Sequence, residues 1–100
     1  MDGMSLKIVH EPLFDDEYDK YDGVDPFDEP LRGLIWAIGM NPSAFDVLPD
    51  HHYKGLELRL AKSDAIERYD DTFIPRMVIY FAVDEAAGEI LLIYVEPQDE

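Results

Sequence analysis

Two long apolar segments in the second half of the chain constrain the fold more than any other feature. Residues 76–83 and 90–95 are rich in branched and aromatic residues, and only Arg76 carries a charge. This composition is typical of strands that are buried on both faces. The intervening residues 84–88 have the length and composition of a hairpin loop. We therefore expect two consecutive antiparallel strands here.

Further strands are predicted on both sides of this hairpin. In residues 56–60, leucines alternate with Glu57 and Arg59, which predicts a strand with one buried face and one polar face. Residues 6–9 predict a first strand, and residues 66–69 predict another short one. Residues 42–53 mix Pro, Ser, Asp and His with isolated apolar residues, which predicts a connection without regular structure.

Two helices are expected between the first strand and the later ones. Apolar residues recur at helical spacing after Pro12, and proline suits the first turn of a helix. Asp28 is positioned to cap a second helix, which is expected to end within residues 39–42. The apolar stripe of this second helix predicts that one face packs on a sheet, and it consists of Leu31, Leu34, Ile35 and Ile38.

The order of these elements predicts an α+β fold. An N-terminal strand and two helices are followed by three or four strands, so two helices should pack on a mainly antiparallel sheet. One hundred residues fit a single domain over residues 1–100, and 47% hydrophobic residues suffice for a core.

The charge of the chain limits its partners. With 23 acidic and 8 basic residues the formal net charge is −15, which opposes attraction to nucleic acids and anionic lipids. Acids are concentrated in residues 11–29, where Lys20 is the only base, whereas most bases fall in residues 54–76. The absence of cysteine excludes disulfides and thiolate chemistry. No apolar run approaches the roughly 20 residues of a membrane span, so we expect a cytoplasmic protein without a membrane partner.

The acidic segment does not have the pattern of a calcium site. Gly23 and Glu29 fit the sixth and twelfth positions of an EF-hand loop, but Tyr18 and Lys20 occupy the first and third ligand positions. A solvated acidic surface is the preferred interpretation, and salt adaptation of the source organism would also produce it.

The histidines offer a second metal hypothesis. His51 and His52 follow Asp50 directly, and His10 is a candidate third ligand. Adjacent residues rarely chelate one ion together, so we favour a surface loop. We predict no metal and no cofactor.

Arg59 and Arg76 are the candidate catalytic residues. If their strands are neighbours, both guanidinium groups and Lys54 or Lys62 are expected to line one concave face and to stabilise a phosphate or a developing phosphorane charge. In so acidic a chain, the alternative is that the arginines pair with nearby carboxylates. The carboxylates considered for this pairing are Glu57, Glu67 and Asp70.

Residues 6–95 resemble the RelE/ParE toxin superfamily of toxin–antitoxin modules. The pattern that carries this resemblance comprises Pro12-Leu13-Phe14 followed by Tyr18, the second helix closed by Asn41-Pro42, the strand entry Gly55-Leu56-Glu57-Leu58, and the strand 76–84 with its hairpin into 90–95. The resemblance implies a small α+β toxin fold. It also implies either cleavage of messenger RNA on the ribosome or inhibition of DNA gyrase, with neutralisation by an antitoxin protein.

The resemblance carries only two site residues over to this chain. Arg76 matches the arginine that opens the family's central strand, although Asp84 follows about two residues later than usual, and Arg59 lies on the preceding strand. The His–Arg pair that many members carry after the last strand is missing from residues 96–100. The expected function is a toxin-like component lacking the standard ribonuclease residues, with RNA endonuclease activity left open. The alternative is a non-enzymatic acidic interaction or inhibitor module that binds a basic protein.

Overall fold

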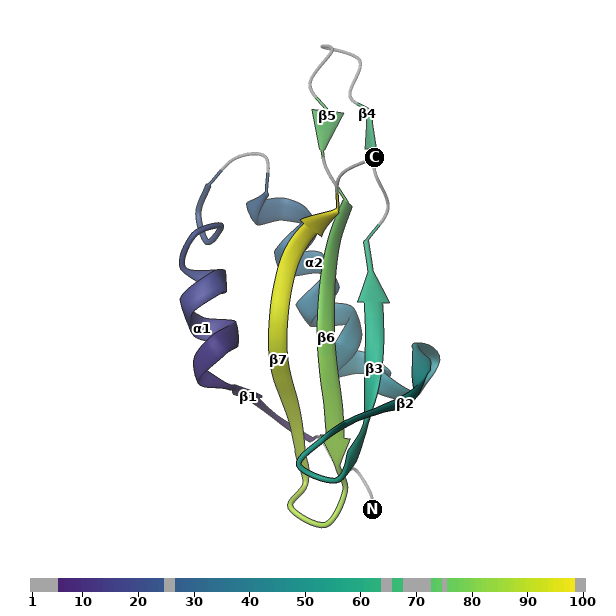
Figure 1. The fold of residues 1–100 in the computed structure, drawn as a ribbon. Helices are drawn as coiled ribbons and strands as arrows, with labels where there is room; N and C mark the ends of the chain where they lie inside the picture. Colours follow the sequence, from purple (N-terminus) through teal and green to yellow (C-terminus); the bar gives the residue numbers. More distant parts are fainter. Residues whose placement is uncertain (1–5, 25–26, 64–65, 68–72, 75, 99–100) are drawn as a thin grey trace.

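A five-stranded sheet forms the centre of the fold (Figure 1). The computed structural model describes residues 6–24, 27–63, 66–67, 73–74 and 76–98. The sheet has the order β1-β7-β6-β3-β2. Its strands are β1 (Lys7–His10), β2 (Asp46–Tyr53), β3 (Leu56–Lys62), β6 (Arg76–Asp84) and β7 (Glu89–Gln98). The predicted α+β class is confirmed, and four strands after the helices complete the sheet.

The first and last strands of the chain are neighbours. β1 runs parallel to β7, with Lys7 paired to Glu89 and His10 paired to Leu92. Every other pairing in the sheet is antiparallel, as the prediction of a mainly antiparallel sheet requires. The predicted hairpin joins β6 to β7 through residues 85–88, and Gly88 adopts a positive φ of 70° at its end.

Two helices lie between β1 and β2, as predicted. Helix α1 (Pro12–Tyr18) packs along β7, and helix α2 (Asp28–Met40) packs on β6 and β3. The buried side chains between the two helices and one face of the sheet form a single core. Its largest fully buried members are Phe14, Leu31, Ile38, Met77, Ile79, Phe81, Ile90, Leu92 and Val95.

The predicted cap of α2 is wrong. Asp28 is the first residue of the helix, and the cap position is taken by Phe27, which forms no side-chain cap bond. The carboxylate of Asp28 instead accepts hydrogen bonds from the Gly23 backbone N–H at 2.8 Å and from Arg32 Nε at 3.0 Å. These two donors hold the pKa of Asp28 below its ordinary value, the Gly23 N–H having the larger effect.

Residues 42–53, predicted as an irregular connection, form a short 3-10 helix η1 (Pro42–Ala44) and strand β2. Val47 pairs with Arg59 and His52 pairs with Glu57, so residues 48–51 lie opposite Leu58 alone. This bulge removes the alternation by which a strand is recognised. Beyond it, the end of β2 crosses in front of β3 (Figure 1).

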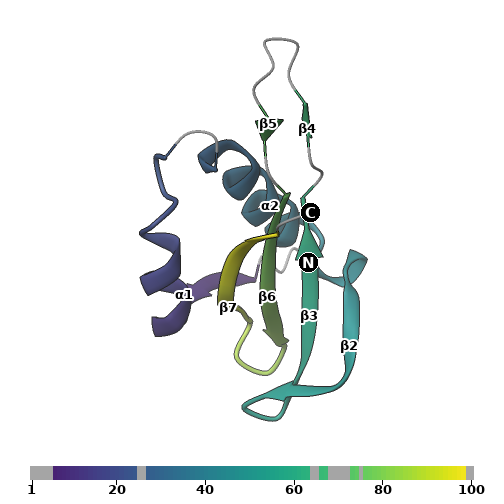
Figure 2. The ribbon, with the colours of Figure 1, turned by 45° about the horizontal axis from the view of Figure 1, so that its top comes forward.

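The remaining differences concern short elements. β1 begins and ends one residue later than predicted. β4 (Ile66–Glu67) covers the first two residues of the strand predicted at 66–69, and residues 68–69 lie outside the described part of the chain. β4 pairs with β5 (Phe73–Ile74), a strand that was not predicted, in a separate ladder beyond β3 and β6 (Figure 2). In the described part of the chain, no helix has the length and apolar character needed to cross a membrane.

Candidate functional site

The two faces of the sheet differ in what covers them. We call the face against α2 the core face and the opposite one the outer face. Leu56 and Leu58 lie on the outer face, where they and Tyr53 pack half-buried against a second apolar cluster. The buried members of that cluster are Ala82, Leu91 and Ile93. The predicted leucine face of β3 therefore packs away from the helices.

Arg59 and Arg76 lie on opposite faces of the sheet. Arg59 pairs with Phe81, a member of the core between sheet and helices, and paired residues share a face. Arg76 precedes Met77, another core residue, so its side chain leaves on the outer face. Arg76 and Phe81 are also five positions apart on β6, roughly 17 Å at about 3.4 Å per residue. The common concave face expected for these arginines does not form.

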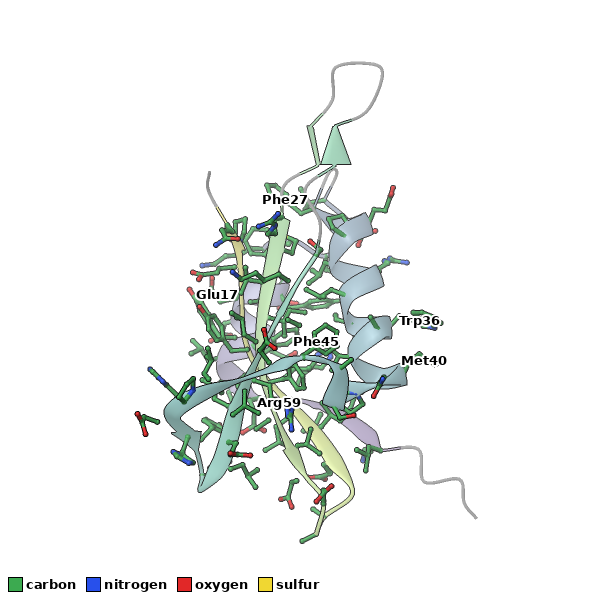
Figure 3. The ribbon with its side chains drawn as sticks, turned by 90° about the vertical axis from the view of Figure 1, so that its right-hand side faces the viewer. Glu17, Phe27, Trp36, Met40, Phe45 and Arg59 are labelled. Carbon is green, nitrogen blue, oxygen red and sulfur yellow. The ribbon has the colours of Figure 1, made fainter. Side chains whose placement is uncertain are left out.

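Arg59 is bound to the backbone of the segment that follows η1. Its Nη1 donates a hydrogen bond of 2.8 Å to the carbonyl oxygen of Phe45, and Figure 3 shows the two residues close together. The Arg59 side chain lines a pocket of about 410 Å³ together with Ser43, Glu57 and Glu85. Among the described residues, no carboxylate oxygen lies within 4.0 Å of a side-chain nitrogen of Arg59 or Arg76. Glu57 therefore forms no ion pair with Arg59. The side chains of Glu67 and Asp70, also considered as partners, are outside the described part of the chain.

Two cations of this region, Lys62 and Arg76, lie on the outer face. Lys62 pairs with Val78, two residues along β6 from Arg76, so Lys62 and Arg76 project from the same side. Next to them, the rings of Tyr80 and Tyr94 lie 6.1 Å apart, and Tyr80 donates a hydrogen bond of 3.4 Å to Glu96. Burial, the largest effect, raises the pKa of both tyrosines above its ordinary value.

The two cations and the two tyrosine rings suit an anionic, planar ligand, and the Glu96 carboxylate beside Tyr80 offsets part of their positive charge. Aromatic faces stack on bases, and cations hold phosphate oxygens. We call Lys62, Arg76, Tyr80 and Tyr94 the outer-face cluster. Lys54, the other expected basic member of the site, lies elsewhere, at the β2–β3 turn.

A buried carboxylate that the sequence does not reveal ties the β2–β3 turn to the start of α1. The Glu11 side chain is only 11% exposed and accepts hydrogen bonds from the Tyr53 hydroxyl at 2.5 Å and from Lys54 Nζ at 3.1 Å. The Tyr53 hydroxyl is the main reason why the pKa of Glu11 is lowered, and Lys54 adds to the effect. No spacing or motif relates these residues, since the contact spans most of the first half of the chain.

The histidines do not form a metal centre. His10 Nδ1 lies 2.9 Å from Asp15 Oδ1, whereas His51 Nδ1 lies 2.8 Å from the carbonyl oxygen of Pro49. No group of three His, Asp or Glu side chains in the described ranges is arranged to hold a metal ion. The acidic segment presents exposed carboxylates on α1 and the turn after it, namely Asp15, Asp16, Asp19 and Asp22.

Comparison of the sequence with models of known protein families finds no match. Comparison with curated proteins finds no match either. The functional assignment therefore depends on the fold and on the side chains described above.

Proposed function

We propose that the chain is a toxin-like component of a toxin–antitoxin module with a RelE/ParE-type fold, and that it lacks the standard ribonuclease residues. The sequence of strand, helix, helix and strands that underlies the resemblance is the order of the folded elements. The separation of Arg59 from Arg76 argues against a two-arginine nuclease site. An antitoxin protein is the partner that this proposal requires.

The outer-face cluster carries the proposal. It places two cations and two tyrosines on the sheet face that α2 leaves free. Such a surface can contact RNA on the ribosome or a protein target such as gyrase. The net charge of −15 lowers its affinity for free RNA, so we expect contact with a structured target rather than with RNA alone.

Growth of a bacterial host tests the proposal. The chain is expressed from an inducible promoter, alone and together with the neighbouring open reading frame. We expect growth arrest that the neighbour relieves, and we expect Arg76→Ala combined with Lys62→Ala to weaken the arrest.

Arg32→Ala is the matched control, because Arg32 is an exposed arginine on α2 that is bound to Asp28 and lies far from the outer face. Circular dichroism of each purified variant checks that it is folded. Normal growth at high levels of folded protein would contradict the proposal. If Arg32→Ala weakened the growth arrest as much as the Lys62→Ala and Arg76→Ala double variant does, this result would contradict the role of the outer-face cluster.

A second candidate function is favoured by the exposed carboxylates of α1 and of the turn after it. A non-enzymatic module would use Asp15, Asp16, Asp19 and Asp22 to bind a basic protein. This function predicts tight, salt-sensitive binding of a basic partner that is lost when all four residues are changed to asparagine. Unchanged binding by that variant would rule out this surface.

A further inference from the structure

The pocket beside Arg59 lies where η1, the start of β3 and the β6–β7 hairpin meet. Its volume of about 410 Å³ is in the range of small-molecule sites, roughly 300–1,000 Å³. Leu6 and Val83 supply an aliphatic wall that is packed on the core. The charged residues of the pocket are Glu57, Arg59 and Glu85. The pocket therefore presents charges of both signs beside an aliphatic surface.

The guanidinium group of Arg59 is held on one edge and open on the other. Its Nη1 donates the hydrogen bond of 2.8 Å to the Phe45 carbonyl oxygen. Within the described ranges, Nε and Nη2 have no hydrogen-bond partner and no carboxylate oxygen within 4.0 Å. Nε and Nη2 share the edge opposite Nη1, and their parallel N–H groups match the two oxygens of one carboxylate. Arg59 is thus oriented for a carboxylate that the described chain does not supply.

The two carboxylates of the pocket also lack partners. Neither the Glu57 nor the Glu85 side chain forms a hydrogen bond or an ion pair with the described residues. Glu57 and Arg59 are two positions apart on β3, so they project from the same face with Cα atoms about 7 Å apart. The two side chains leave their charges unpaired, so a ligand with both an ammonium and a carboxylate group can bind between them.

Charge selects among the possible ligands. A simple anion on Arg59 would lie in a pocket that also contains Glu57 and Glu85, in a chain of net charge −15. A simple cation on Glu57 would leave the open edge of the guanidinium group without an acceptor. A zwitterion provides a partner for each sign and adds no net charge. An α-amino acid carries the two charged groups on one carbon atom, next to a side chain that can contact the aliphatic wall.

We propose that this pocket binds a free α-amino acid with an aliphatic side chain. The ligand carboxylate accepts hydrogen bonds from Nε and Nη2 of Arg59, and the ligand ammonium group donates to Glu57. The aliphatic side chain packs on Leu6 and Val83. This proposal goes beyond the proposed function, because Arg59 and the outer-face cluster are on opposite faces of the sheet. Failure of the growth assay leaves it standing, and failure of the test below leaves the toxin proposal standing.

Isothermal titration of the full chain with L-leucine tests the proposal. Two analogues each lack one of the charges, since 4-methylpentanoate has no ammonium group and L-leucinamide has no carboxylate. We expect leucine to bind at one site, and each analogue to bind at least about tenfold more weakly, because each loses a hydrogen bond between charged groups.

Variants locate the binding in the pocket. Arg59→Gln should weaken leucine binding at least about tenfold. Arg32→Gln is the matched control, because Arg32 is bound to Asp28 on α2 and does not line the pocket, so the affinity should change less than about twofold. Circular dichroism checks that each variant is folded.

Glu57→Gln keeps the test decisive even if Arg59→Gln does not fold. Glu57 is an exposed residue, and its change to glutamine should weaken leucine binding about tenfold without weakening the binding of 4-methylpentanoate, which has no ammonium group. No saturable binding of leucine up to about 10 mM would overturn the proposal. Equally tight binding of either analogue, or an equal loss in Arg32→Gln, would overturn it as well.

Discussion

The hydroxyl of Tyr53 lies 2.5 Å from a carboxylate oxygen of Glu11, although 42 positions separate the two residues in the sequence. This hydrogen bond connects the β2–β3 turn to the start of α1. A hydrogen bond to a charged group contributes about 1.5–3 kcal/mol to stability when it is formed in a buried place. Since Tyr53 is only half-buried, we expect this hydrogen bond to contribute an amount near the lower end of that range.

Tyr53→Phe should therefore lower the free energy of unfolding by about 1–2 kcal/mol in urea denaturation. Tyr94→Phe is the control, because Tyr94 is also half-buried on the outer face and its hydroxyl has no hydrogen-bond partner among the described residues. Equal stability losses in the two variants would show that the Glu11 contact contributes nothing specific.

The stabilising effect of Glu11 should depend on pH. Its pKa is below the ordinary 4.5 in the folded protein, so on acidification the unfolded chain takes up this proton first. The contribution is complete above the ordinary pKa and is lost as the pH falls through the folded value. The gap in unfolding free energy between the wild type and Glu11→Gln should accordingly be wide about one pH unit above the ordinary pKa and should narrow steadily as the pH falls below it.

Asp16→Asn is the control for this pH series. It removes one negative charge from an exposed site, so it shares with Glu11→Gln any relief of overall charge repulsion. The change of its difference from the wild type with pH therefore measures the effect of overall charge. A difference for Glu11→Gln that runs parallel to the Asp16→Asn difference over this range would contradict the lowered pKa of Glu11.

Arg59 and Arg76 should behave as independent residues. Arg59→Ala removes the bond to the Phe45 carbonyl and should cost about 1 kcal/mol of stability. Because Arg76 is on the other face, the double variant should equal the sum of the single variants to within about 0.5 kcal/mol. A coupling energy above about 1 kcal/mol in a double-mutant cycle would show that the two side chains interact, which would contradict their placement on opposite faces.

The two glycines inside α2 should respond differently to alanine. Gly33→Ala should stabilise the protein by about 0.5–1 kcal/mol, since alanine favours helix and the new methyl group meets nothing within 4 Å. At Gly39 the new Cβ would lie 3.1 Å from Ile8 Cδ1, so that side chain has to move. Thermal denaturation should show a smaller gain for Gly39→Ala, and a larger one would contradict this packing.

The sequence was sufficient to predict the elements whose pattern is continuous. The apolar stripe of α2 and the uninterrupted apolar strands β6 and β7 were each predicted in place, because periodicity depends only on local burial. β2 was missed because its bulge places residues 48–51 opposite Leu58 and interrupts the alternation. The cap of α2 was misassigned because the carboxylate of Asp28 binds the preceding turn through Gly23.

The candidate site was harder to predict than the fold. Local alternation correctly directed Arg59 away from the leucines of β3. Whether Arg76 lies on the same face of the sheet as Arg59 depends on the register in which β3 pairs with β6. A shift of that register by one residue would place the two arginines on the same face. The Glu11–Tyr53 contact depends on how far the hairpin of β2 and β3 extends across the sheet. That distance cannot be predicted from the local sequence pattern.

The parallel pairing of β1 with β7 has a consequence for how the protein is made. Lys7 leaves the ribosome long before Glu89, its partner in the sheet, has been synthesised. Until β7 emerges, Ile8 has no neighbouring strand, and the core residues Leu31 and Ile38 lack the Ile90 and Leu92 side chains of that strand. The sheet and its core can therefore be completed only after β7 has been synthesised, however early β1 and the two helices emerge.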